Sequence, residues 1–170
     1  RAGQDQGQVP MALPAVDFRT RIADPIAGGN VTLQVNSLNI LRPEGQDTQR
    51  AFAKAQWDWR RITPLGQQLT LTALVRGDVY HSDDNASTPT ALYRGIEGWQ
   101  TRGIVTAAAD VKWPFVGEFL GGTQVLTPRV QLVASPQLRN LAIPNEDSRA
   151  IDLETSNLFA LNRFPGYDRV

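Results

Sequence analysis

The chain has 170 residues, of which 41% are hydrophobic and 20% charged, and 17 basic residues balance 17 acidic ones. This zero net charge argues against a general nucleic-acid-binding protein, and the absence of cysteine excludes disulfides, thiolate metal sites and cysteine nucleophiles. No apolar run approaches the roughly 18 residues that a membrane helix requires. Strands of a membrane barrel are not excluded, because their apolar residues recur only at every second position.

Six segments alternate with a two-residue period, which predicts extended strands because successive side chains of a strand point to opposite faces. In chain order they are residues 16–23, 31–41, 48–60, 68–80, 99–113 and 123–134. The alternation slips at Ser37–Leu38, where we expect a β-bulge. The last segment contains Pro128, which has no N–H to donate to a sheet. The pattern predicts an all-β protein built on an antiparallel meander of about six strands.

The connections between these segments alternate between two kinds. The compact ones, rich in the glycine and proline that tight turns require, are residues 25–30, 63–67 and 114–122. The other connections are residues 43–47, 82–98 and the final segment 135–170. Short turns at one rim and longer loops at the other are typical of outer-membrane barrels, whose short turns are periplasmic. We therefore expect residues 135–170 to form a long external loop.

All thirteen charged residues of the expected strands lie on one phase of the alternation. The other phase is apolar and rich in small residues such as Ala53 and Gly77, which would bury little area in a soluble core. Several strands reach the roughly 9–11 residues that a membrane-spanning strand needs. A basic residue on a lipid face would cost about 2–4 kcal/mol at the bilayer midplane. The pattern favours a wall with lipid on one face and water on the other.

The charged face carries an excess of basic residues, nine against the four aspartates Asp17, Asp58, Asp78 and Asp110. Such an interior would attract an anionic, phosphorylated passenger. The candidate contacts for this passenger or for a plug are Arg19, Arg21, Arg50, Lys54, Arg76, Arg102, Lys112 and Arg129. Alternatively, these groups pair with one another or with an acidic plug and only keep the lumen wet.

Six strands are too few to close, since the smallest single-chain barrels have about eight. An open sheet in lipid would leave unpaired backbone groups at both edges. We therefore expect the chain to be an internal piece of a larger transmembrane barrel. Two other interpretations are a piece of a porin or receptor-type barrel and a soluble β-sandwich that acts as a binding module.

Catalytic motifs are weak in this chain. The single histidine, His81, lies beside Asp83 and Asp84, and no serine near it lies in a nucleophile elbow. We interpret this acidic loop as solvated rather than as a calcium site. No glycine-rich phosphate loop or dinucleotide fingerprint is present. We expect no enzymatic activity, no cofactor and no metal.

The C-terminal segment carries the most specific motif. Residues Ile143 to Ser148 (IPNEDS) and Asn157 to Arg169 (NLFALNRFPGYDR) resemble the barrel domain of the LptD family of lipopolysaccharide-assembly proteins, as does the loop 42–50. The motif residues singled out as a candidate site are Asn162, Arg163, Phe164, Pro165, Gly166, Tyr167, Asp168 and Arg169. Proline and glycine predict a turn there. The flanking charges predict a loop that folds into the lumen or contacts the passenger, with Asp168 holding the loop through an arginine.

The resemblance implies an outer-membrane barrel that inserts lipopolysaccharide into the outer leaflet of the Gram-negative outer membrane. It implies an N-terminal periplasmic jellyroll that receives lipopolysaccharide from bridge proteins, a plug formed by the lipoprotein LptE, and a lateral opening between the first and last strands. These residues lack the jellyroll, the gate strands and the cysteines of some members. The implied partners are lipopolysaccharide, membrane lipid, LptE and, through the missing domain, the periplasmic bridge proteins.

Overall fold

The computed structural model describes residues 9–137, 140–149 and 151–170. Six strands form one antiparallel sheet in the order β1-β2-β3-β4-β5-β8, and β6 pairs with β7 alone. The strands are β1 (Met11–Ile26), β2 (Gly29–Leu41), β3 (Asp47–Ile62), β4 (Gln68–Asp83), β5 (Gly98–Lys112), β6 (Phe115–Phe119), β7 (Gly122–Leu126) and β8 (Arg129–Ala134). The predicted all-β antiparallel meander is confirmed.

Helix is confined to short pieces in the part of the chain that the structure describes. They are 3-10 turns at Asn85–Ser87 and Asn140–Ala142 and the single helical turn α1 (Ala91–Arg94). Across the described residues, none of these helices has the length and apolar character needed to cross a membrane.

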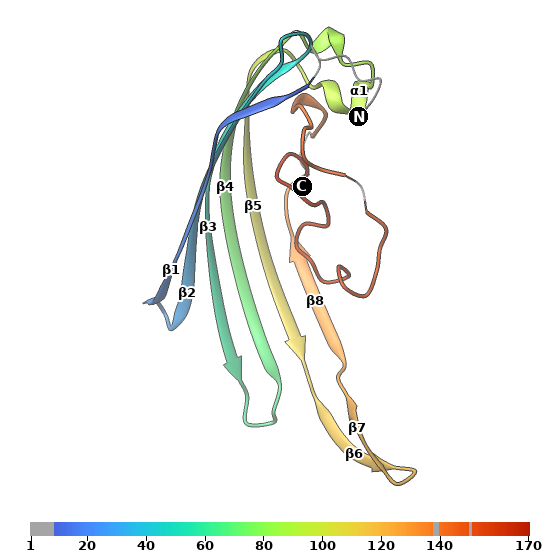
Figure 1. The fold of residues 1–170 in the computed structure, drawn as a ribbon. Helices are drawn as coiled ribbons and strands as arrows, with labels where there is room; N and C mark the ends of the chain where they lie inside the picture. The colour runs from blue at the N-terminus through green and yellow to red at the C-terminus, as the bar shows by residue number, and fades with distance from the viewer. Residues whose placement is uncertain (1–8, 138–139, 150) are drawn as a thin grey trace.

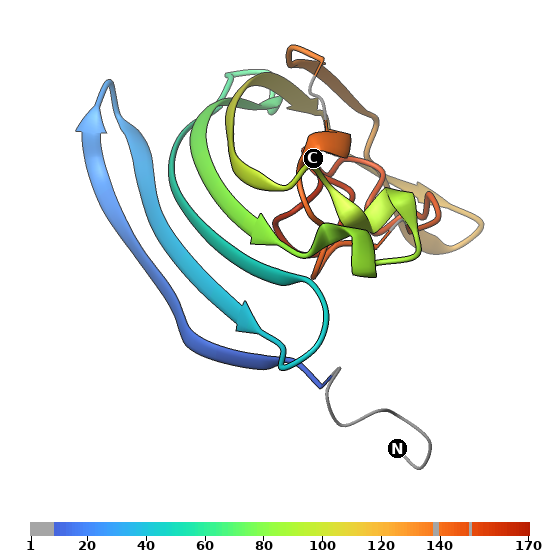
Figure 2. The same ribbon diagram turned by 90° about the horizontal axis from the view of Figure 1, so that it is seen from above.

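The sheet is a curved wall with an open concave side (Figure 1). Short turns join the strands at one end, and the longer loops, including α1, gather at the other. Seen from above, β1 to β5 sweep in an arc around the C-terminal segment (Figure 2). Within the described residues β1 and β8 are the two edge strands, so this sheet does not close. A single curved layer also differs from the two packed sheets of a β-sandwich.

The two faces of the wall invert the order of a soluble protein. Val35, Val75 and Val105, on the convex face, are 50%, 52% and 55% exposed. Arg50 and Arg102, on the concave face, are only 6% and 8% exposed. Charged residues are almost never buried in soluble proteins unless they are paired. The charges on the concave side therefore need partners, while the convex side is an exposed apolar surface.

Strand pairing is regular through Ser37–Leu38, where the sequence pattern predicted a bulge. The register of β2 with β3 runs without a break from Asn30 to Ile40. The irregularity lies instead on β1, between Ala12 and Ala15 and again between Ile22 and Ile26. No residue is inserted at this point: Leu38 is an apolar residue at a position of the charged phase, paired with Arg50 on a continuous strand.

The range 123–134, expected as one strand, is divided into β7 and β8 at Thr127–Pro128. Pro114 interrupts the opposite strand near the same level, and the backbone N–H of Trp113 donates to the carbonyl of Pro128 at 3.0 Å. Proline lacks an amide hydrogen, so a regular ladder cannot continue through either position. The range 114–122 is therefore no compact turn. With Thr123 to Leu126 it forms the ribbon β6–β7, which extends past the other short turns (Figure 1).

Tryptophans mark the short-turn end of the wall. The indole N–H of Trp57 donates to the carbonyl of Ile26 at 3.1 Å, and that of Trp113 donates to the carbonyl of Leu65 at 3.0 Å. Each ring thereby ties its own strand to a neighbouring short turn. Trp99 lies at the other end of the wall, where it is 69% exposed and packs against His81 in a tilted arrangement, with ring centroids 4.7 Å apart.

Candidate functional site

The C-terminal segment, defined here as residues 135–170, folds back from β8 across the concave face (Figures 1 and 2). It was expected as a long external loop. In the structure its IPNEDS and NRFPGYDR motifs lie side by side against the charged ends of β3, β4 and β5. We call the resulting set of buried polar contacts the arginine clamp; it consists of Arg50, Arg76, Asp78, Tyr80, Arg102, Asp147, Tyr167 and Asp168.

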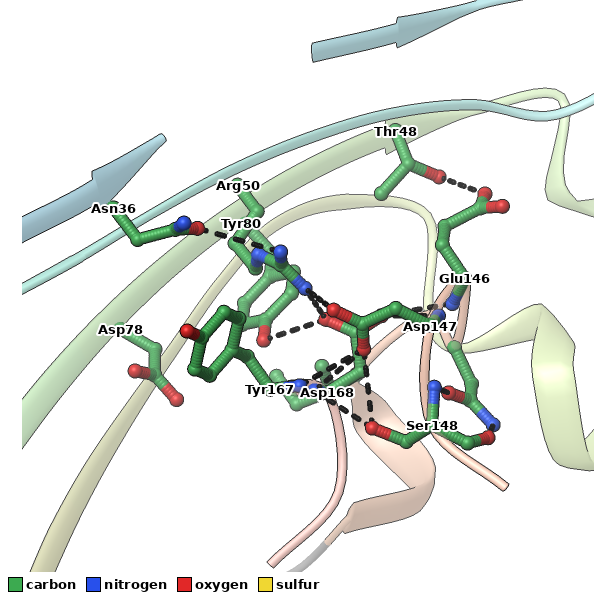
Figure 3. A network of polar contacts seen from close by, with 12 residues as sticks. Asn36, Thr48, Arg50, Asp78, Tyr80, Glu146, Asp147, Ser148, Tyr167 and Asp168 are labelled. Carbon is green, nitrogen blue, oxygen red and sulfur yellow. Dashed lines mark hydrogen bonds and ion pairs between the residues drawn. The ribbon is translucent and has the colours of Figure 1, made fainter. Parts of the chain in front are cut away.

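Asp168 is the centre of the arginine clamp (Figure 3). Its Oδ1 accepts hydrogen bonds from Nη1 of Arg50 at 2.6 Å and from the hydroxyl of Tyr80 at 3.0 Å. Its Oδ2 accepts from the backbone N–H groups of Glu146 at 2.8 Å and Asp147 at 3.2 Å. The carboxylate is 1% exposed. Four donors therefore compensate for its burial, as a buried charge requires.

Asp147 joins the two motifs of the segment to the same arginine. Its Oδ2 accepts from Nη1 of Arg50 at 2.7 Å, while its Oδ1 accepts from the backbone N–H groups of Tyr167 at 3.0 Å and Asp168 at 3.1 Å. Gly166 makes this approach feasible. A Cβ added there would lie 2.5 Å from Oδ1 of Asp147, and its φ of +79° favours glycine.

Asp78 orients two further arginines toward the segment. It accepts from Nε of Arg76 at 2.6 Å and from Nε of Arg102 at 2.7 Å. The outer nitrogens of these guanidinium groups then donate to the backbone, from Arg76 to the carbonyl of Tyr167 at 2.8 Å and from Arg102 to that of Asp168 at 2.9 Å. The planar guanidinium suits this double role because its donors point in fixed directions.

The ring of Tyr167 extends the contact toward β1 and β2. It packs on Phe52 with ring centroids 4.8 Å apart. Its hydroxyl donates to Oδ2 of Asp17 at 2.9 Å and accepts from Nε2 of Gln34 at 2.9 Å. One residue of the motif thus reaches three strands.

A second set of contacts ties the segment to the longer loops. The guanidinium of Arg169 donates to the carbonyls of Leu92 at 2.6 Å and Ile143 at 2.9 Å. Glu146 pairs with Arg42 at 2.7 Å and accepts from the hydroxyl of Thr48 at 2.8 Å. The loops 42–46 and 84–97 are therefore fastened to the C-terminal segment at the long-loop end of the wall.

Burial and neighbouring charge set the titration of the segment. Burial raises the pKa of Asp168, and the adjacent Asp147 raises it further, although Arg50 opposes both. Burial also acts to raise the pKa of Asp147, but Arg50 and the N–H of Tyr167 outweigh it and lower that pKa. Burial lowers the pKa of the Arg169 guanidinium.

The eight basic residues proposed as lumen contacts fall into distinct groups. Arg50, Arg76 and Arg102 meet in the arginine clamp. Arg129 pairs with Asp110 at 2.7 Å and lies 3.9 Å from the ring of Phe159. The other four form no ion pair with any described residue; they are Arg19, Arg21, Lys54 and Lys112.

The motif residues are likewise divided. Asn162 caps the motif, accepting from the N–H of Phe164 at 3.0 Å and donating to the carbonyl of Arg169 at 2.8 Å. Gly166, Tyr167, Asp168 and Arg169 make the contacts described above, while Arg163 and Pro165 are exposed. Sequence reasoning missed Tyr80 and Asp147 as partners. The acidic IPNEDS motif and a tyrosine on the charged phase were the available signals.

The protein is a two-faced antiparallel meander, and its charged face holds the inward-folded C-terminal segment. The family model described as LptD, LPS transport system D, matches residues 3–170. The chain therefore belongs to the LptD family, whose members serve lipopolysaccharide transport and outer-membrane assembly. The family resemblance of the sequence motifs is confirmed. A comparison with curated proteins found no match.

Proposed function

We propose that the chain forms part of the wall of the outer-membrane translocon that assembles lipopolysaccharide into the outer leaflet. The single observation that carries this proposal is the inverted wall, apolar outside and charged inside, with the family's motif held on the inner face. In this role the convex face contacts acyl chains, and the concave face borders an aqueous lumen. Membership of the LptD family supports lipopolysaccharide as the passenger.

The open edges support a larger assembly. Within the described residues, β1 and β8 each pair with a single neighbour in the six-stranded sheet. Unpaired backbone groups in hydrocarbon cost several kcal/mol each, so open sheet edges are not found there. We therefore propose that further strands pair with both edges and close the barrel.

The basic residues of the concave face fall into those that bind the C-terminal segment and those that do not. Because Arg50, Arg76 and Arg102 already hold the C-terminal segment, they have few donors left for a passenger. Lys54 and Lys112 carry their charge without an ionic partner among the described residues. We propose that these two, together with Arg19 and Arg21, face lipopolysaccharide or the plug.

The proposed partners follow from the same assembly. The lipoprotein LptE would occupy the lumen as a plug, and the C-terminal segment would form part of its contact. The periplasmic bridge proteins would deliver lipopolysaccharide through an N-terminal jellyroll of the full-length protein. The proposed location is the outer membrane of a Gram-negative cell.

Spin labels on the full-length protein in lipid vesicles test the central claim. Labels at Ala53, Val75 and Val105 on the convex face should relax more strongly with oxygen, which concentrates in lipid, than with a water-soluble nickel reagent. A label at Thr70, on the concave face of β4, serves as the matched control and should show the reverse preference. Stronger relaxation by nickel at all three convex positions would overturn the membrane-wall proposal.

A further inference from the structure

A cavity of about 560 Å³ lies between the concave face and the C-terminal segment, beside the arginine clamp. Its volume is within the roughly 300–1,000 Å³ of small-molecule sites. Two aliphatic residues on the mostly polar phase of the strands, Leu74 and Ile104, line it from the wall. They lie on adjacent strands, since Leu74 pairs with Thr106 and Arg76 pairs with Ile104.

The C-terminal segment supplies the opposite side of this cavity. Leu161, Phe164, Tyr167 and Val170 line it there, and Pro136 lines it near the end of β8. Neither Leu161 nor Phe164 is fully buried, so their apolar surfaces are not saturated by protein contacts. Thr106, Ser135, Gln137 and Asn162 also line the cavity, but most of its surface is apolar, which favours a hydrocarbon chain.

Lys54 places one positive charge at the edge of this lining. It is half-buried and forms no ion pair or side-chain hydrogen bond with the described residues. The neighbouring Arg76 also lines the cavity, but its guanidinium is bound to Asp78 and to the carbonyl of Tyr167. Lys54 is therefore the cation with free donors for an anionic group.

We propose that this cavity binds one hydrocarbon chain of an anionic amphiphile, with Lys54 contacting the carboxylate or phosphate. The chain would lie between Leu74 and Ile104 on the wall and Leu161 and Phe164 on the segment. The site requires only that the C-terminal segment cover the concave face, so it stands apart from the translocation proposal. A fatty acid, an anionic phospholipid and a lipid A moiety all share the required chemistry.

Photolabelling of the full-length protein, in complex with the partners it is purified with, tests the site. A photoreactive 16-carbon fatty acid would be added to phosphatidylcholine nanodiscs, and labelled residues would be mapped by mass spectrometry. Labelling of residues 161–170, relative to labelling of the convex face, is the measured quantity. L74W should lower this ratio at least tenfold by filling the cavity, whereas V75W, one residue away on the convex face, should leave it unchanged.

Two further variants keep the result decisive. L161W fills the same cavity from the segment and should reproduce the loss if L74W does not fold, as judged by heat-modifiable gel mobility. K54Q should weaken labelling by the fatty acid several-fold but leave labelling by the corresponding uncharged alcohol unchanged. Equal labelling in V75W and in the folded cavity-filling variants would overturn the site. Equal fatty-acid labelling in K54Q and wild type would overturn the anionic contact.

Competition identifies the source of the chain. Unlabelled fatty acid, phosphatidylglycerol and lipid A would be titrated against the photoreactive probe. The competitor that displaces half of the probe at the lowest concentration is the class that the cavity prefers. If none of the three displaces the probe from residues 161–170, the labelling is non-specific and the proposal fails.

Discussion

The two ends of the concave face use the same residue types in different ways. At the long-loop end, Arg50 and Arg102 are buried and bound to the C-terminal segment. At the short-turn end Arg129 still pairs with Asp110, but Arg60 is exposed and Lys112 is half-buried, and neither of these two forms an ion pair with a described residue. The charged phase of the strands therefore serves two purposes. Its buried members build structure, and its free members remain available to a ligand.

Of the changes considered, loss of the Asp168 carboxylate should destabilise the long-loop end of the concave face most. D168A leaves the buried Arg50 with Asp147 as its only ionic partner among the described residues and removes the acceptor of the Tyr80 hydroxyl. Removing one partner of a buried ion pair costs about 3–5 kcal/mol. Hydrogen exchange of residues 143–148 in the full-length protein should accelerate by two orders of magnitude or more. D152A, at an exposed position of the same segment, should leave that exchange unchanged.

A smaller loss should follow from G166A. The new Cβ would meet the Asp147 carboxylate at a backbone φ that favours glycine, and such strain costs on the order of 1–3 kcal/mol. The same exchange measurement should show an intermediate acceleration. G103A is the matched control because nothing lies within 4 Å of the position of its Cβ. Equal exchange rates in both variants would mean that the close approach of Gly166 to Asp147 does not hold the C-terminal segment in place.

Low pH should destabilise the long-loop end of the concave face, because Asp147 becomes protonated. The folded-state pKa of Asp147 is lowered, so its contribution to stability is complete above the usual aspartate pKa of about 3.9. It is lost as the pH falls through the depressed value, because the unfolded chain then binds more protons. The pKa of Asp168 is raised instead, so the titration of Asp168 increases the stability of the folded state as the pH falls. A thermal-shift titration of D147N should show a flatter decline below pH 4 than wild type; parallel declines would contradict the assignment.

Substitutions at the short-turn end of the concave face should have almost no effect on stability. R60Q combined with K112Q removes two cations that lack ionic partners, and such surface changes usually stay within about 0.5 kcal/mol. The melting temperature should be unchanged, while photocrosslinking of lipopolysaccharide to the lumen should fall. R50Q is the contrasting variant and should lower the melting temperature. A destabilised double variant with normal crosslinking would remove the distinction between the two ends.

The faces of the wall could be read from the sequence because alternation is a local property of each strand. Lys54 and Val75 follow the phase of their neighbours, and no tertiary information is needed to place them on opposite faces. The division at Pro128 was signalled by its missing N–H, but the matching break at Pro114 was obscured by glycines that suggested a compact turn.

The arginine clamp could be predicted only in outline. The pair Arg50–Asp168 joins residues 118 positions apart, and its formation depends on where the C-terminal segment crosses the sheet. The sequence predicted that Asp168 would pair with an arginine, as it does with Arg50, but it did not indicate which arginine would be the partner. The cavity could not be predicted, because nothing local explains why the aliphatic Leu74 and Ile104 lie on the phase that carries the charges. Its meaning required the residues that lie opposite.

The paired prolines at the base of the ribbon β6–β7 have a mechanical consequence. Pro114 and Pro128 interrupt the ladder at one level, so the bond from Trp113 to Pro128 joins ribbon and wall where regular pairing stops. The ribbon is therefore joined to the wall less tightly than neighbouring strands of the wall are joined to each other. Five paired residues at about 3.3 Å each give the ribbon a length of roughly 16 Å beyond this level.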